Sequence, residues 1–117
     1  MGAKAMHDLF LTEEEFSVFA VLRRRKGKER AIGKKELAKI LGMDERMVRR
    51  VIKALIEEHG VPVGSDYVRG YFIVAAPEEV EETYQTLKNH ALSILKRAAV
   101  LKRISLKRLL GQLEVEL

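Results

Sequence analysis

The cationic side chains of residues 44–59 are the part of this sequence best suited to chemistry. Arg46, Arg49, Arg50 and Lys53 recur at intervals of three or one residues, which places them along one side of a helix. A guanidinium fork matches phosphate oxygens and the edge of guanine, and a lysine ammonium attracts phosphate with less geometric specificity. The pattern therefore favours binding of a polyanion over transformation of a substrate.

The helix that would carry these cations also has an apolar side, which must be buried. Asp44 is a good N-cap, and Gly60 suits the position just after a helix, where a left-handed backbone is common. We therefore predict a helix over residues 44–59. Its apolar side consists of Met47, Val48, Val51, Ile52, Leu55 and Ile56.

A shorter helix is predicted immediately before it, over residues 34–41. Leu37, Ala38 and Leu41 would face inward, and Gly42 would end the helix. Residues 34–53 are thus predicted to form two short helices joined by a tight turn.

A β-hairpin is predicted directly after these helices, with strands over residues 61–65 and 70–74. Pro62 restricts the first strand to an edge or to a strand start, because proline has no backbone N–H. Residues 66–69 would connect the strands, and Gly70 would adopt a backbone conformation that other residues avoid. Ala31 and Ile32 could add a very short strand.

A first helix is predicted over residues 13–26, upstream of the helix pair. Thr12 and Glu15 match a capping box, in which each side chain accepts a hydrogen bond from the other residue's backbone N–H. Gly27 is the expected stop. The apolar residues at helical spacing are Phe16, Phe19, Ala20 and Leu22.

A long helix over residues 78–102 should follow Pro77, since no Gly or Pro interrupts it. Its apolar stripe alternates in steps of four and three, as in a coiled coil. A helix of this length, at about 1.5 Å per residue, would extend past a small domain, so we expect it to form a homodimer; packing on its own domain is the alternative. The stripe consists of Val80, Tyr84, Leu87, Ala91, Ile94, Ala98 and Leu101.

The last residues give two weaker patterns. Ser105 is a candidate cap for a short helix that would end near Gly111. Residues 113–117 alternate apolar and acidic side chains, which predicts a terminal strand.

Composition and charge limit the class of protein. The 117 residues suit one domain, are 47% hydrophobic and 33% charged, and include no Cys, so we expect a cytoplasmic protein without disulfides or thiolate metal sites. The net charge is +5, but residues 21–55 hold 13 Lys or Arg against 4 Asp or Glu, a net of +9. The positive charge therefore gathers on the helix pair, either as a polyanion-binding surface or as a solvated basic face.

No catalytic or metal site is predicted. Ser93 and Lys96 match a short acylase pattern whose companion motifs are missing, and no glycine-rich phosphate loop occurs. His7, His59 and His90 lack ligand spacing, so we interpret each as a surface or capping residue. We therefore expect no enzyme activity, no cofactor, no small-molecule ligand and no membrane span.

The order of helices and hairpin over residues 12–74 resembles the winged-helix family of DNA-binding domains. Residues 44–55, DERMVRRVIKAL, look like the recognition helices of bacterial winged-helix regulators, including the N-terminal domain of the biotin-operon repressor. Residues 60–73, GVPVGSDYVRGYFI, look like their wing. Met43 replaces the more usual branched apolar residue, a mild departure.

The resemblance implies a fold that is mainly α with a small β-hairpin: a winged helix-turn-helix over residues 1–76 and a dimerising helical extension over residues 77–117. It implies sequence-specific binding of double-stranded DNA, with residues 44–59 in the major groove and residues 61–74 as wing, in a transcriptional regulator. The alternatives are a protein-interaction module and a phage- or replication-type DNA-organising protein. The implied DNA-binding residues are Lys34, Lys35, Glu45, Arg46, Arg49, Arg50, Lys53 and Arg69.

Overall fold

The structure is a computed structural model that describes residues 10–117. The chain divides into two compact units between Val80 and Glu81. Within the described residues the fold is mainly helical with one small β-hairpin and one long helix, which confirms the predicted fold class at that level.

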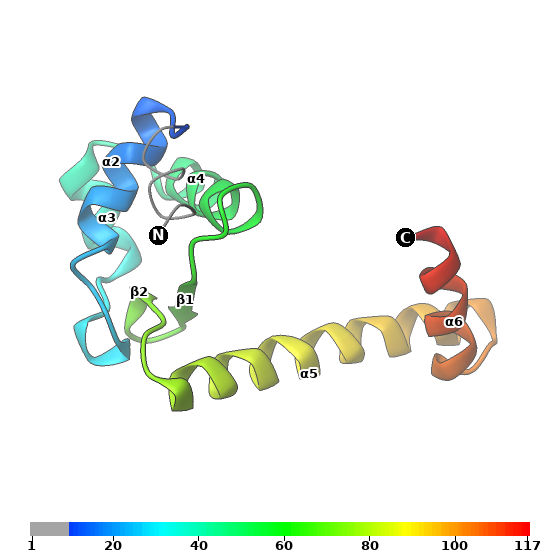
Figure 1. The fold of residues 1–117 in the computed structure, drawn as a ribbon. Helices are drawn as coiled ribbons and strands as arrows, with labels where there is room; N and C mark the ends of the chain where they lie inside the picture. Colours follow the sequence, from blue (N-terminus) through cyan, green and yellow to red (C-terminus); the bar gives the residue numbers. More distant parts are fainter. Residues whose placement is uncertain (1–9) are drawn as a thin grey trace. The chain divides into compact units, whose positions relative to one another are not determined.

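Among its described residues, the first unit holds three complete helices, a short 3-10 turn, the hairpin and the first turn of a long helix. Figure 1 shows the three helices and the hairpin gathered together. The hairpin is antiparallel and pairs Val63 with Ile73 and Asp66 with Gly70. Two isolated bridges extend the pairing to Ile32 and Lys26. The elements are α2 (Glu13–Leu22), η1 (Lys28–Arg30), α3 (Lys34–Leu41), α4 (Glu45–Glu57), β1 (Val63–Asp66) and β2 (Gly70–Ile73).

The core of this unit collects the apolar side of each helix. α2 contributes Val18 and Leu22, and α4 contributes its whole inward face. Each fully buried aliphatic side chain stabilises the fold by about 1.5–3 kcal/mol relative to exposure. The buried cluster comprises Val18, Leu22, Ile32, Leu37, Ala38, Val48, Val51, Ile52, Leu55, Val61 and Tyr71.

Local capping explains where the helices begin and end. The Thr12 hydroxyl accepts from the Glu15 N–H at 3.1 Å and the Glu15 carboxylate accepts from the Thr12 N–H at 3.0 Å, so the predicted capping box is present. The Asp44 carboxylate caps α4 by accepting from the Met47 N–H at 2.7 Å. Gly42 ends α3 with a left-handed backbone, φ 65°, which glycine adopts without steric penalty.

Helix α2 is shorter than predicted, because residues 25–27 pair with β2. The Arg25 carbonyl accepts from the Ile73 N–H at 2.7 Å, and the Gly27 N–H donates to the Ile73 carbonyl at 2.8 Å. The prediction that the helix reaches Lys26 was therefore wrong. Of the apolar residues predicted for this helix, Leu22 is buried, but Phe16 is 51% exposed, and the buried Val18 was not among them.

The second unit contains the rest of α5 (Pro77–Lys102) and α6 (Leu106–Glu116). α5 ends at Lys102, and Arg103 follows it with a φ of 56°. The N–H groups of Arg103 and Ile104 donate to the carbonyls of Val100 and Ala99, respectively. This pattern is a Schellman motif with arginine in the position that usually holds glycine.

Helix α6 corrects two predictions for the end of the chain. Ser105 caps the helix as expected, but the helix continues through Gly111 to Glu116, so residues 113–117 form no strand. Spacings of three and four residues turn Leu106, Leu109 and Leu113 to the less exposed side. Val115 is 88% exposed, and within residues 10–117 no strand lies beside residues 113–117 to pair with their backbone.

Candidate nucleic-acid interface

Helix α4 presents a cationic surface because its opposite side is anchored in the core. Val48, Val51, Ile52 and Leu55 are buried, and this fixes the rotation of the helix about its axis. The remaining side of the helix faces solvent. Arg46, Arg49, Arg50 and Lys53 are all exposed, together with Glu45.

Three of the predicted DNA-binding residues meet at Tyr71 of β2. The Lys34 ammonium nitrogen lies 5.5 Å from the centroid of the Tyr71 ring. Burial raises the pKa of the Tyr71 phenol, against the opposing effects of the Arg49 charge and an Arg49 hydrogen bond, while Glu45 adds to the rise. Tyr71 therefore joins the start of α3 to the cationic side of α4.

Tyr71 was not singled out from the sequence, because its neighbours lie far from it along the chain, on α3 and α4. The alternation of residues 70–74 was the available signal, and it predicted a strand but not its cationic surroundings.

Gly70 allows β2 to approach the start of α3. Its φ is 102°, and a Cβ atom built there would lie 2.0 Å from the Ile32 carbonyl oxygen. The Ile32 N–H donates to the Tyr71 carbonyl at 2.8 Å, and the Tyr71 N–H donates to the Ile32 carbonyl at 2.9 Å. Only glycine fits this contact without displacing the backbone.

Arg50 lies on a different side of α4 from Arg49. An Arg50 guanidinium nitrogen approaches the Met47 sulfur at 3.0 Å. Arg50 and Met47 line a shallow hollow together with Thr12 and Glu14 at the start of α2. The structure thus places Arg49 near β2 and Arg50 near the start of α2.

The hairpin loop is held by an aspartate. The Asp66 carboxylate accepts from the N–H groups of Arg69 at 2.8 Å and Val68 at 2.9 Å, and these bonds lower the pKa of Asp66. The Lys28 ammonium lies 3.7 Å from the same carboxylate. Arg69 is exposed at the end of this loop, as predicted, and Lys35 is exposed on α3.

The tip of the loop also exposes two large side chains that the sequence analysis did not use. Tyr67 is 96% exposed and Val68 is 87% exposed. An ordered loop that presents such groups to water is suited to contact another surface.

A further group of arginines lies just after α2 and in η1. Arg23, Arg24, Arg25 and Arg30 surround an open hollow of about 750 Å³ that also includes Ile40. Cations are favoured at a helix C-terminus, so the helix dipole accounts for part of this group.

Glu79 ties the first turn of α5 to the rest of the first unit. Its carboxylate accepts from the Lys28 N–H at 2.8 Å and from the Ala75 N–H at 3.2 Å. These bonds, the first being the larger cause, lower the pKa of Glu79. Glu79 lies in the first turn of α5, where the helix dipole favours a carboxylate, but its bond to residue 28 is a long-range contact that no local pattern indicates.

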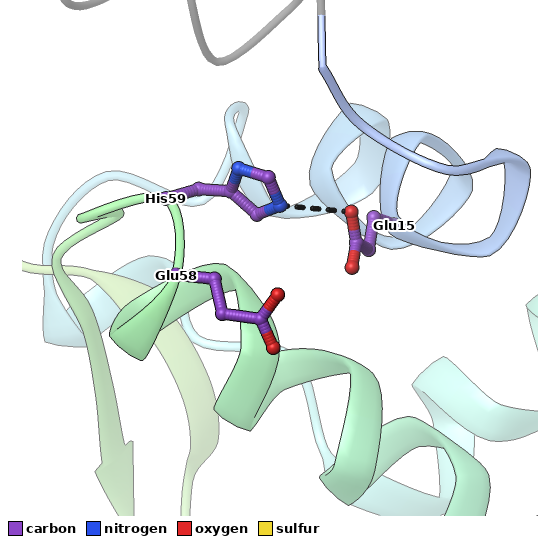
Figure 2. A group of neighbouring side chains, drawn as sticks. All are labelled: Glu15, Glu58 and His59. Atoms are coloured by element: carbon purple, nitrogen blue, oxygen red, sulfur yellow. Dashed lines mark hydrogen bonds and ion pairs between the residues drawn. The ribbon is translucent and has the colours of Figure 1, made fainter.

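His59 was predicted to be a surface or capping residue, but its side chain is largely buried beside Glu15. Its Nε2 atom lies 2.9 Å from Oε1 of Glu15, and its side chain is only 14% exposed. Figure 2 shows Glu15, Glu58 and His59 gathered where the start of α2 meets the end of α4. His7 lies outside the described residues.

The predicted dimerisation stripe lies largely open along α5. Val80 and Tyr84 are each 53% exposed, Leu87 is 64% exposed, Ile94 is 49% exposed and Leu101 is 84% exposed. Ala91 is also exposed, and Ala98 is partly buried. Most of the stripe is thus accessible to a partner in the isolated chain.

Comparisons of the chain with protein-family models, with curated proteins and with solved structures found no match. Among the helices of residues 10–117, none has the combination of length and apolarity needed to cross a membrane.

Proposed function

We propose that this protein is a winged-helix DNA-binding protein that reads double-stranded DNA with α4. The observation that carries the proposal is the exposure of four cations on a helix whose other side is buried in the core. An α-helix of this kind fits the major groove, where arginine can bind guanine and phosphate. Exposed Arg69 on the hairpin loop and Lys35 on α3 would add contacts on either side.

The three parts of the proposed surface would have different tasks. Arg46 and Arg49 are assigned to base edges or nearby phosphates, and Lys53 to phosphate alone. The loop between β1 and β2 would act as the wing, with Arg69 directed to phosphate or the minor groove. Lys34 would be held near the DNA by its contact with Tyr71.

The proposal includes a homodimer formed through α5. Its support is the open apolar stripe, since apolar side chains of this size at coiled-coil spacing are stabilised by burial against a second helix. A two-fold dimer would address two half-sites one or two turns of DNA apart, so the preferred site would be nearly palindromic. Transcriptional regulation in the cytoplasm is the use we favour; a DNA-organising role would employ the same surface.

The proposal is tested by fluorescence anisotropy with labelled duplexes drawn from a selection on random sequences. Arg49→Glu combined with Arg50→Glu should abolish measurable binding. Arg23→Glu combined with Arg24→Glu makes the same change in net charge on the arginine group of α2, and should weaken binding far less. Equal losses from the two pairs would show that binding follows net charge rather than α4.

The exposed loop tip supports a second candidate, a winged-helix module that binds another protein. Tyr67 and Val68 would then be the contact residues, together with α5. Tyr67→Ser combined with Val68→Ser distinguishes the two functions. Duplex affinity should fall if the loop is a DNA-binding wing and stay unchanged if it binds a protein.

A further inference from the structure

The side chains of Glu15, Glu58 and His59 bring three potential metal ligands together. Each offers one ligand atom, and these atoms all lie within 4.8 Å of one another. Figure 2 shows the Glu15 and Glu58 carboxylates and the His59 ring directed toward one region between α2 and the end of α4. We propose that these residues bind one divalent transition-metal ion, for which Zn²⁺ is the probe.

The distances suit such an ion after a small adjustment. Zn²⁺ with ligands at about 2.0–2.1 Å in tetrahedral geometry holds its ligand atoms about 3.4 Å apart. Nε2 of His59 and Oε1 of Glu15 are already 2.9 Å apart. Glu58 is exposed at the C-cap of α4, so rotation of its side chain can bring its carboxylate into range.

Two of the ligands are held in place before any ion binds. Glu15 is only 9% exposed, and its Oε1 accepts the Thr12 N–H of the capping box at 3.0 Å. The His59 side chain is 14% exposed. A bound ion would take the place of the hydrogen bond between Nε2 of His59 and Oε1 of Glu15, and the capping bond would continue to orient the Glu15 carboxylate.

The kinds of ligand point to a class of metal. One imidazole nitrogen with two carboxylates suits Zn²⁺, Co²⁺ or Ni²⁺, whereas Mg²⁺ and Ca²⁺ prefer oxygen ligands alone. Three protein ligands leave a fourth position for water. The ion would link the start of α2 to the end of α4 and stabilise the first unit, independently of the proposed DNA binding.

The contact between Glu15 and His59 would also form in a simple ion pair, so Glu58 is the informative residue. Among the described residues the Glu58 carboxylate has no hydrogen-bond or ion-pair partner. Its replacement should therefore leave the metal-free fold intact. Glu57, its exposed neighbour on α4, supplies a control of the same charge.

The experiment titrates Zn²⁺ into the chelator-treated full chain by isothermal calorimetry and follows thermal unfolding. We expect one ion per chain and a rise in Tm of at least about 5 °C at a hundredfold excess over Kd. Glu58→Gln should weaken affinity at least about tenfold without changing the metal-free Tm. Glu57→Gln should leave both values unchanged.

His59→Gln should remove binding, and His90→Gln should not, because His90 is exposed on α5. The proposal is overturned if the wild-type chain takes up no ion, if Glu58→Gln binds as tightly as wild type, or if binding survives His59→Gln. Unchanged DNA binding in these variants would show that the metal site and the DNA-binding surface act independently.

Discussion

The Lys34 ammonium nitrogen lies 5.5 Å from the centroid of the Tyr71 ring, at the junction of α3 and β2. Tyr71 is 6% exposed, so its ring is a fixed support, whereas Lys34 remains partly accessible. The contact restricts a long flexible cation close to the exposed side of α4. It thereby connects the packing of the hairpin with the electrostatics of the proposed DNA surface.

Removing the Lys34 charge should cost a small, measurable part of the stability. Lys34→Met keeps the aliphatic stem and should lower the free energy of unfolding by about 0.5–1 kcal/mol, the usual strength of a cation–π contact. Lys35→Met, on the exposed neighbour, should change it by less than about 0.5 kcal/mol. Chemical denaturation measures both values, and equal effects would show that the ring contributes nothing.

Gly70 should tolerate no larger residue without a substantial loss of stability. Gly70→Ala places a Cβ atom against the Ile32 carbonyl at a φ of 102°, so we expect a loss of more than about 2 kcal/mol. Gly111→Ala is the matched comparison, because nothing lies within 4 Å of its added Cβ. As Gly111 lies inside α6, that change should stabilise the helix by about 0.5–1 kcal/mol. Denaturation monitored by circular dichroism measures both changes, and a tolerated Gly70→Ala would contradict the described packing.

Stability should depend on pH through Glu79. The pKa of Glu79 lies below its ordinary 4.5 in the folded chain, so its contribution is present above pH 4.5 and is lost as pH falls through the folded pKa. Glu79→Gln should therefore lower the urea midpoint at pH 7, and the difference from wild type should shrink below pH 4.5. The exposed neighbour Glu78→Gln should show a smaller difference at both pH values. If the difference in urea midpoint between wild type and Glu79→Gln were the same at both pH values, the ionised carboxylate would not be the source of the stabilisation.

Locally determined features were predictable from the sequence. The caps at Thr12 and Asp44 and the stop at Gly42 each depend on residues within one helical turn, and all three are present. The exposure of the α4 cations also followed from helical periodicity. Pairing over long separations was not predictable: Glu79 bonds residue 28 across 51 positions.

The incorrect predictions also arise from contacts between residues that are far apart in the sequence. α2 ends before Lys26 because the backbone groups of Arg25 and Gly27 form hydrogen bonds with Ile73 instead of continuing the helix. No pattern within residues 13–27 indicates this pairing. His59 pairs with Glu15 across 44 positions, so its sequence neighbours gave no indication of burial. Residues 113–117 alternate like a strand, but a strand needs a partner that the sequence pattern cannot supply.

The α5 stripe should control both oligomeric state and DNA affinity. Leu87→Glu places a charge in the middle of the proposed helix–helix contact, and light scattering should then report a monomer where the wild type is a dimer. Thr86→Glu is the control, because Thr86 is exposed one position outside the stripe.

On a duplex with two half-sites, the monomeric variant should bind at least about a hundredfold more weakly, since the second half-site no longer benefits from linkage. On a duplex with a single half-site, the wild-type chain and Leu87→Glu should bind with the same affinity. A wild-type chain that stays monomeric at high concentration would contradict the dimer. DNA binding by α4 would still be tested separately, by the paired substitutions Arg49→Glu with Arg50→Glu and Arg23→Glu with Arg24→Glu.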